Sequence, residues 1–121
     1  HQRQVGTTVN VKELFFNLPA RKKFLHSERA EYQMCIGEVI RCAIPYPEIS
    51  FLMRHNGKNT LRLRSGTLEE RVMELYGKEF LNGMIYIEDK NNLIHLYGWV
   101  SQPNESVFPY QMIFVNKRSV W

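Results

Sequence analysis

Residues 6–24 read GTTVNVKELFFNLPARKKF, and this stretch sets the order of the first elements of the fold. β-Branched residues alternate from Thr7 towards Phe15, which predicts a strand over 7–15. Pro19 suits the first position of a helix, where an N–H group would lack an intrahelical acceptor in any case. We therefore expect a strand, a turn at 17–19 and a short helix that runs through Phe24 and Leu25.

A second, longer helix follows. Ser27 is a candidate N-cap, and Glu28 and Glu31 lie near the positive end of the helix. Pro45 and Pro47 mark the end of this predicted helix. Apolar residues recur at three- and four-residue spacing and predict a broad core-facing stripe: Tyr32, Cys35, Ile36, Val39, Ile40 and Ala43.

Both cysteines lie on this predicted helix, at Cys35 and Cys42. Seven residues of helix span about 10 Å, which is too far for a disulfide between them. We expect two reduced thiols in the core of an intracellular protein.

A hairpin is predicted next, because Asn56-Gly57 lies between the strand-like runs 51–55 and 59–64. Asn-Gly suits the two positive φ angles of a tight hairpin turn. In the second strand Leu61 and Leu63 face one side, and Arg62 and Arg64 face the other.

The remaining chain mixes a helix with strands. Thr67 and Glu70 form a capping box, Gly77 is a plausible helix C-cap, and a second short helical turn is possible near 78–81. Residues 84–88 and 93–100 read as a hairpin around 89–92, and 110–115 as a final strand. This order predicts an α+β fold, a strand–helix–hairpin unit followed by a helix and an antiparallel sheet, with the best candidate joint at residues 65–67.

The composition indicates a globular domain. The chain has 121 residues, 44% of them apolar and 23% charged, and no apolar run approaches the ~18 residues of a membrane span. The polar start shows no secretory signal. The net charge is +4, with basic residues concentrated in 1–23 and in 54–66, and the second of these stretches holds no acid. Such clusters suit a polyanion, although a merely solvated surface is the alternative.

Catalytic and metal chemistry is not indicated. His26, His55 and His95 fall on three different predicted elements, without ligand-like spacing to each other or to the cysteines. Asp89 is the one aspartate of the chain and lies in a predicted turn. The sequence has no nucleophile elbow and no glycine-rich phosphate loop, so we expect no catalytic residue and no metal site.

The composite string GTTV…LFxNxPARxKF at 6–24 resembles the MutL family of mismatch-repair proteins. RHNGK at 54–58, YGWV at 97–100 and FVNKRSV at 114–120 are similar to later pieces of that family, in the same order. The resemblance covers nearly the whole chain and favours a bacterial origin. It implies that 1–66 form the last part of a GHKL-type ATPase domain. It also implies that 67–121 begin a transducer domain with a ribosomal-protein-like β-α-β fold.

The resemblance also implies binding residues. Gly6, Thr7 and Thr8 match the fourth ATPase motif, where a threonine hydroxyl and a close backbone border the adenine pocket. Ordinary strand threonines are the alternative. Eight basic residues are candidate DNA contacts: Arg21, Lys22, Lys23, Arg54, Arg62, Arg64, Lys117 and Arg118.

Each basic group has a structural alternative. The cluster at 21–23 could pair with Glu28 or Glu31, Arg21 could pack against the ATPase fold, and the hairpin arginines could form a solvated face. For Asn116, which precedes Lys117, we expect hydrogen bonds to local backbone groups and not a DNA contact.

For the whole protein, the resemblance implies an ATP-dependent DNA clamp that relays mismatch recognition to strand incision. It would use ATP and Mg²⁺ and form an ATP-dependent homodimer. It would act with DNA, a MutS-like sensor, an incision endonuclease and a helicase in the bacterial cytoplasm, associated with the nucleoid. The family's earlier ATPase motifs are not in this sequence, so we expect no ATP hydrolysis by this chain alone. Two other readings stay open: a stand-alone basic nucleic-acid-binding module and a structural self-association domain.

Overall fold

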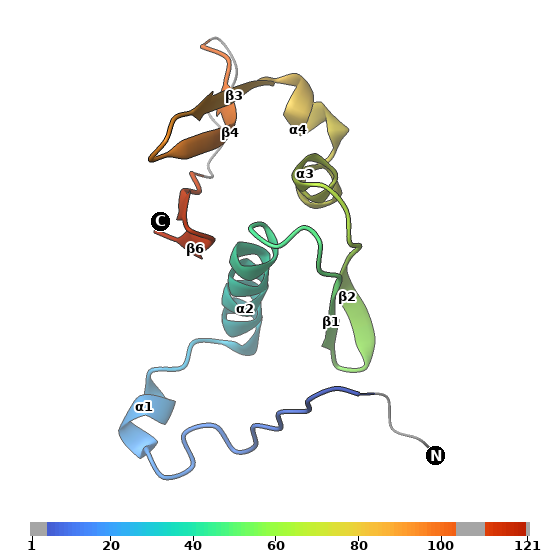
Figure 1. Cartoon of the computed structure of the whole chain (residues 1–121). Helices are drawn as coiled ribbons and strands as arrows, with labels where there is room; N and C mark the ends of the chain where they lie inside the picture. The colour runs from blue at the N-terminus through green and yellow to red at the C-terminus, as the bar shows by residue number, and fades with distance from the viewer. Residues whose placement is uncertain (1–4, 104–110, 121) are drawn as a thin grey trace. The chain divides into compact units, whose positions relative to one another are not determined.

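The computed structural model describes residues 5–103 and 111–120. The chain divides into two compact units, 1–36 and 37–121, which are described separately below. Helices and two-stranded antiparallel hairpins alternate along it (Figure 1), so the predicted α+β class is confirmed. Within the described ranges, no helix is long and apolar enough to cross a membrane.

In the first unit, helix α1 spans Pro19–Lys23, with proline at its start as predicted. It ends one residue before Phe24, which is its C-cap. The predicted strand over 7–15 is wrong: residues 6–12 join no described strand, and 14–17 form a turn. Alternating β-branched residues favour an extended backbone, but a strand also needs a neighbour for its N–H and C=O groups.

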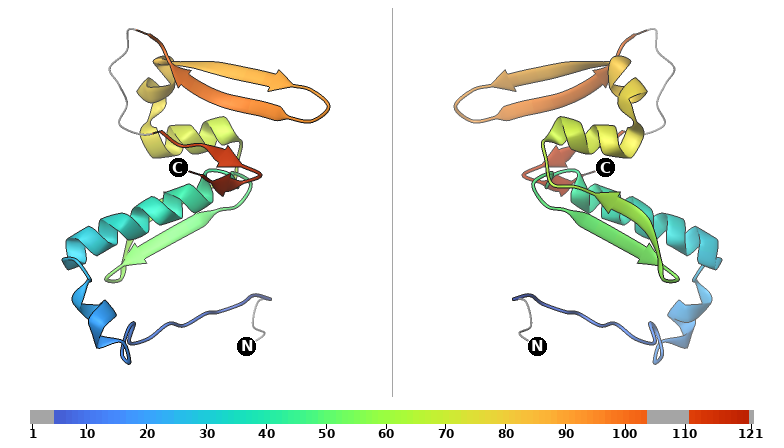
Figure 2. Two further views of the ribbon diagram at one scale, coloured as in Figure 1. Left: turned by 90° about the vertical axis from the view of Figure 1, so that its left-hand side faces the viewer. Right: turned by 90° about the vertical axis from the view of Figure 1, so that its right-hand side faces the viewer.

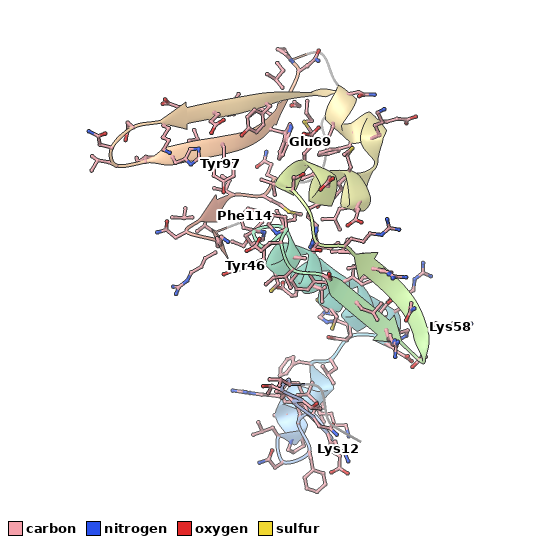
Figure 3. The ribbon with its side chains drawn as sticks, turned by 45° about the vertical axis from the view of Figure 1, so that its right-hand side comes forward. Lys12, Tyr46, Lys58, Glu69, Tyr97 and Phe114 are labelled. Atoms are coloured by element: carbon pink, nitrogen blue, oxygen red, sulfur yellow. The ribbon has the colours of Figure 1, made fainter. Side chains whose placement is uncertain are left out.

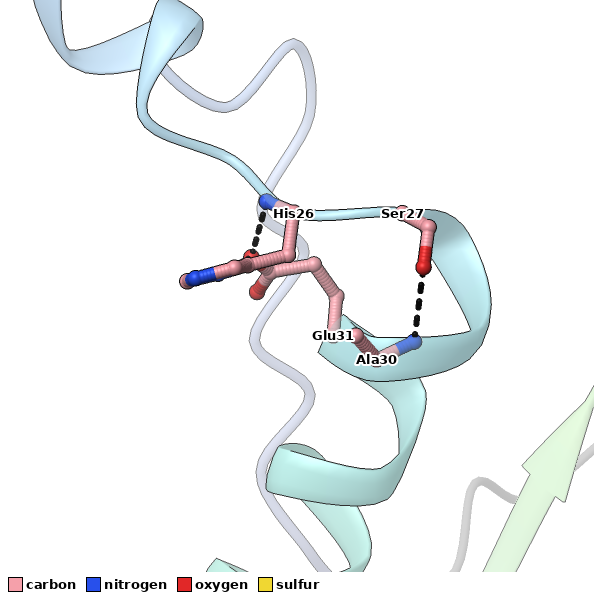
Figure 4. A network of polar contacts seen from close by, with 4 residues as sticks. All are labelled: His26, Ser27, Ala30 and Glu31. Carbon is pink, nitrogen blue, oxygen red and sulfur yellow. Dashed lines mark hydrogen bonds and ion pairs between the residues drawn. The ribbon is translucent and has the colours of Figure 1, made fainter.

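Helix α2, Glu28–Ala43, begins as predicted at Ser27. The Ser27 hydroxyl accepts a hydrogen bond from the Ala30 N–H at 3.3 Å. The Glu31 carboxylate accepts from the His26 N–H at 2.8 Å and lies 3.2 Å from the His26 ring nitrogen (Figure 4). Both contacts lower the pKa of Glu31 below its ordinary value. The hydrogen bond from the His26 backbone N–H has the larger effect, and the hydrogen bond with the His26 ring has the smaller one.

The apolar stripe of α2 is only partly buried. Ala43 is fully buried, whereas Ile36, Val39 and Ile40 are half-buried. Cys35 and Cys42 are free, as expected, but both are exposed, so the prediction of core thiols is wrong. Periodicity selects the face of a helix, whereas burial requires another element to cover that face.

In the second unit, β1 (Phe51–His55) pairs with β2 (Lys58–Leu63) in an antiparallel hairpin. Asn56 and Gly57 form the turn with φ angles of 48° and 77°, as predicted from Asn-Gly. The second strand begins and ends one residue earlier than expected. Leu61 is half-buried and Leu63 is buried, so the predicted alternation of leucine and arginine is confirmed.

Helix α3 spans Leu68–Tyr76, and α4 spans Lys78–Asn82. The predicted capping box is present: the Glu70 N–H donates to the Thr67 hydroxyl at 3.2 Å, and the Thr67 N–H donates to the Glu70 carboxylate at 2.7 Å. Gly77 ends α3 with a φ of 86°, a value that glycine adopts without steric cost.

The predicted hairpin is present as β3 (Met84–Lys90) and β4 (His95–Ser101). Its first strand ends two residues later than predicted, and its turn lies two residues later, at 91–94. The side-chain oxygen of Asn91 accepts the N–H groups of Leu93 and Ile94, both at 2.8 Å, and so fixes the turn there.

Within the described residues, the predicted strand over 110–115 is confirmed only at Phe114–Val115. Phe114–Val115 (β5) pairs with Arg118–Ser119 (β6), and residues 111–113 form no strand. Tyr110 lies outside the described residues. Asn116 and Lys117 have φ angles of 49° and 64°, which reverse the chain where an extended strand would have continued.

The buried centre of this unit contains a charged side chain. Arg71 of α3 is 1% exposed and lies among the buried apolar residues Ala43, Ile44, Leu63 and Val72. Its guanidinium donates four hydrogen bonds to backbone carbonyls: to Ala43 at 3.1 Å, Pro47 at 3.0 Å, Ile49 at 2.7 Å and Arg64 at 2.7 Å. Its carbon Cζ lies 5.4 Å from the centroid of the Phe51 ring.

Arg71 therefore joins the end of α2, the loop after it and the end of β2. The three hairpins are separate two-stranded sheets, and β1–β2 and β3–β4 are visible as two distinct ribbons (Figure 2). No larger sheet forms within the described residues. The assignment of 1–66 and 67–121 to two domains of a larger protein stays a prediction, although Arg71 bonds across that boundary.

Candidate nucleic-acid interface

One face of the β1–β2 hairpin gathers three of the predicted contact residues. A shallow depression of about 600 Å³ covers this face, and Lys58 marks the hairpin tip (Figure 3). The residues that line it are Ser50, Phe51, Leu52, Arg54, Asn59, Arg62, Leu63, Arg64 and Ser65. The structure thus brings Arg54, Arg62 and Arg64 together, as the alternation of β2 predicts. We call this surface the arginine face.

A β-bulge shapes the arginine face. Met53 pairs with Leu61 and Arg54 pairs with Asn59, so Thr60 is an extra residue in β2. The Thr60 hydroxyl donates to the Met53 carbonyl at 3.3 Å. The bulge puts Asn59 on the same side as Arg54, whose Nε donates to the Asn59 side-chain oxygen at 2.9 Å. The alternation of residues along β2 does not predict this bulge.

Arg64 follows the last residue of β2, and helix α3 holds its backbone. The Arg64 N–H donates to the Glu74 carboxylate at 3.0 Å, and the Arg64 carbonyl accepts from Arg71 at 2.7 Å. Two side chains of one helix therefore satisfy both peptide groups of a residue that has no strand partner.

The electrostatics of the arginine face favour an anion. Its described lining residues include three guanidinium groups and no carboxylate. Arginine stays charged at any physiological pH, and neighbouring like charges repel one another unless an anion lies between them. Planar guanidinium groups suit phosphate oxygens in particular, because they can donate two parallel hydrogen bonds.

Lys117 and Arg118 lie elsewhere: Lys117 is in the β5–β6 turn, and Arg118 is the first residue of β6 (Arg118–Ser119). Lys117 forms an ion pair with Glu48 at 3.1 Å, and its ammonium nitrogen lies 4.6 Å from the centroid of the Tyr46 ring. The pKa of the Glu48 carboxyl group is lowered. The main cause is a hydrogen bond from the backbone N–H of Glu48 itself, and the second is the hydrogen bond from Lys117. Lys117 is therefore already paired, whereas Arg118 is exposed on β6.

The cluster Arg21, Lys22 and Lys23 forms the last turn of α1 and is exposed. Basic side chains at this end of a helix interact favourably with its carbonyl groups. Lys22 also borders a small depression of about 320 Å³ within the first unit, with Glu13, Leu14 and Phe16. Of the two suggested acidic partners, Glu31 is bonded to His26.

The predicted nucleotide residues Gly6, Thr7 and Thr8 lie on an exposed, extended segment. Two hydroxyl groups and a glycine backbone fit the border of a nucleotide site, but these residues line neither of the two depressions described above. Their role stays a prediction. Among the described residues, no group of three histidine, cysteine, aspartate or glutamate side chains could hold a metal ion.

Two α3 residues that contact the backbone of Arg64, Arg71 and Glu74, are not among the site residues predicted from the sequence. A signal for Arg71 was present: it lies three residues after Leu68 and four before Leu75, on the apolar side of an amphipathic helix. No comparable signal marks Glu74, because its partner is a backbone N–H group.

Comparisons with known proteins fit this fold. No protein-family model matches the chain. It is 38% identical over 118 residues to the DNA mismatch repair protein MutL of Neisseria gonorrhoeae, an alignment that covers 96% of this chain and 18% of that protein. Against the MutL protein of Cellvibrio japonicus it is 39% identical over 121 residues, covering 95% and 19%.

A solved structure, the Aquifex aeolicus MutL ATPase domain complexed with ADP, matches with a TM-score of 0.67 and 32% identity. The match covers 88% of this chain and 40% of that one. The α+β fold is thus that of a region of a MutL ATPase domain. The chain belongs to the MutL family of DNA mismatch repair proteins, and it spans about a fifth of the length of the curated relatives it matches.

Proposed function

We propose that this chain is the part of an ATP-dependent mismatch-repair clamp that contacts DNA through the arginine face. Family membership supports the role in mismatch repair. The single observation that carries the DNA contact is the convergence of Arg54, Arg62 and Arg64 on one acid-free depression.

The proposed contact is to the phosphate backbone and is independent of sequence. Guanidinium groups on an open, shallow face can neutralise phosphates, and phosphate contacts carry no information about the base sequence. Each neutralised phosphate releases a counterion and contributes about 0.9 to the slope of log K against log salt.

Further phosphate contacts are proposed at Arg21, Lys22, Lys23 and Arg118. Lys117 would join them only by exchanging Glu48 for a phosphate. In the whole protein, Gly6, Thr7 and Thr8 would border the adenine pocket of bound ATP with Mg²⁺. Nucleotide bound there would supply the free energy of dimerisation over DNA. In this chain, the backbone at Gly6 would lie close to the nucleotide, and the hydroxyl groups of Thr7 and Thr8 would form hydrogen bonds at the pocket.

The wider role follows from family membership. We propose that the whole protein forms an ATP-dependent homodimer in the cytoplasm, close to the nucleoid. It would receive the signal of a MutS-like sensor and pass it to an incision endonuclease and a helicase. The similarity of the chain to MutL mismatch-repair proteins supports this role.

The test is duplex DNA binding, measured by fluorescence anisotropy over a series of salt concentrations. The double variant Arg62→Gln/Arg64→Gln should bind more weakly and lose about 2 from the salt slope. Lys78→Gln/Lys90→Gln is the matched control, because it removes the same charge from exposed positions outside the arginine face.

Equal losses in the two double variants would contradict a localised face and leave only general attraction by net charge. Sedimentation at several protein concentrations without DNA tests the alternative of a self-association domain. Assembly that grows with concentration, together with unchanged DNA binding in both variants, would favour that alternative. Measurable ATP turnover by this chain alone would contradict the expectation of an inactive segment.

A further inference from the structure

We propose that Glu74 of α3 is a positioning residue for the arginine face, acting through the backbone of Arg64 together with Arg71. The inference rests on the proposed DNA-binding function of that face, and it names the residue on which the position of Arg64 depends. Arg64 lies one residue beyond the β1–β2 ladder, whose last pair is Phe51 with Leu63. Its own hairpin therefore does not fix its backbone.

Helix α3 supplies what the ladder does not. Glu74 accepts the Arg64 N–H at 3.0 Å, and Arg71 donates to the Arg64 carbonyl at 2.7 Å. Arg71 and Glu74 are three residues apart and so lie on neighbouring positions of one helix face. Because the two bonds hold the peptide groups on both sides of the Arg64 Cα, they limit its φ and ψ angles and so set the direction in which its Cα–Cβ bond points.

Such positioning matters for an anion-binding arginine. A guanidinium group on a free strand end must lose backbone and side-chain freedom when it binds a phosphate, and this loss weakens binding. Restricting Arg64 in advance removes part of that cost. The arrangement also makes the affinity of the hairpin depend on α3, an element that begins only after the chain has left the hairpin.

The proposal makes a prediction opposite in sign to simple electrostatics. Glu74 carries a negative charge near a face that would bind a polyanion, so charge alone predicts tighter DNA binding whenever Glu74 is neutralised. Positioning predicts that Glu74→Ala weakens binding, because the Arg64 N–H loses its acceptor. Glu74→Gln keeps an oxygen acceptor without the charge and should bind as tightly as the original protein or more tightly.

The experiment measures the Kd for a 20-base-pair duplex, as the probe, at one ionic strength. Glu74→Ala should raise Kd by about threefold to tenfold, and Glu74→Gln should not raise it. Glu69→Ala is the control for charge, because Glu69 is an exposed carboxylate of the same helix. In an Arg64→Ala background, which keeps the backbone N–H, Glu74→Ala should no longer weaken binding.

A second readout does not require DNA. Hydrogen exchange of the Arg64 amide, followed by NMR, should accelerate in Glu74→Ala and stay slow in Glu74→Gln. The proposal is overturned if Glu74→Ala binds DNA as tightly as Glu74→Gln, or if its weakening persists without the Arg64 side chain. If Arg64→Ala itself leaves Kd unchanged, the proposed function of the face fails as well. If Arg64→Ala weakens binding and Glu74→Ala does not, only the positioning role is lost.

Discussion

The segment before α2 and the region around Arg71 differ in how their contacts are made. Residues 6–24 carry the longest family-like string, yet their described hydrogen bonds are local, such as Phe16 N–H to Glu13 and Leu18 N–H to Phe15. Val9, Val11 and Phe16 are largely exposed. Arg71 lies in no such string, yet it bonds to carbonyls up to 28 positions away.

The difference shows that the residues which identify a family need not be those that hold the chain together. Local bonds between near neighbours form and break with little loss of chain entropy, whereas long-range bonds make separate elements fold as one unit. We therefore expect substitutions in the two regions to have very different effects on the free energy of unfolding.

The largest effect is expected for Arg71→Met. The variant removes the four hydrogen bonds that the buried Arg71 side chain donates to backbone carbonyls, which should cost about 3–5 kcal/mol of unfolding free energy. Arg71→Lys keeps the charge but has only three donors from one atom, so we expect an intermediate loss. Urea unfolding followed by circular dichroism measures both. Unchanged midpoints would show that the Arg71 contacts do not hold the unit together.

The next effect comes from a pair of large-to-small substitutions, one in each region. Leu63 is 2% exposed, and Leu63→Ala should cost about 2–3 kcal/mol through lost burial and the cavity left behind. Phe16 is 78% exposed, and Phe16→Ala should change stability by less than about 0.5 kcal/mol. Similar losses in thermal or urea unfolding would show that the turn at 14–17 packs more tightly than the exposure of Phe16 indicates.

A pair of glycine substitutions should have effects of opposite sign. Gly57 has a φ of 77° in the β1–β2 turn, and Gly57→Ala should destabilise by about 1 kcal/mol. Gly37 lies inside α2, and an added Cβ would meet nothing within 4 Å, so Gly37→Ala should stabilise by about 0.5–1 kcal/mol. Shifts of the same sign in melting temperature would contradict this account of the two backbones.

The smallest effect is expected in the first unit, from the contact between His26 and Glu31. The folded-state pKa of Glu31 is lowered, so its stabilising contribution is present above pH 4.5 and is lost as the pH falls through that lower pKa. An NMR titration of the His26 amide should follow this transition. Glu31→Gln should abolish the transition, and a titration that survives this change would contradict the assignment.

Much of the second unit could be predicted from sequence. The Asn56-Gly57 turn, the Thr67–Glu70 capping box and the C-cap at Gly77 all appear where the residues predict them. Each depends on side chains within a few positions along the chain. The turn of the β3–β4 hairpin was placed two residues early, because Asn91 selects the register by bonding its own following backbone.

The candidate site was predictable only in part. Alternation in β2 placed Arg62 and Arg64 on one side, and Arg54 followed from pairing across the hairpin. Three features were not predictable: the bulge at Thr60, the ion pair of Lys117 with Glu48, and the hydrogen bonds between α3 side chains and the backbone of Arg64. The double positive φ at Asn116 and Lys117 was also missed, since lysine seldom adopts it.

The sequence by itself determined the family, the helix caps and the glycine-dependent turns, because these depend on residue types and on neighbours a few positions apart. Only the tertiary structure decided which groups are buried and which are held in place. Arg71 became the centre of the second unit, and both cysteines remained exposed, because burial depends on which distant segments cover a side chain. The backbone of Arg64 is bonded in the same way, by a helix that follows it in the chain.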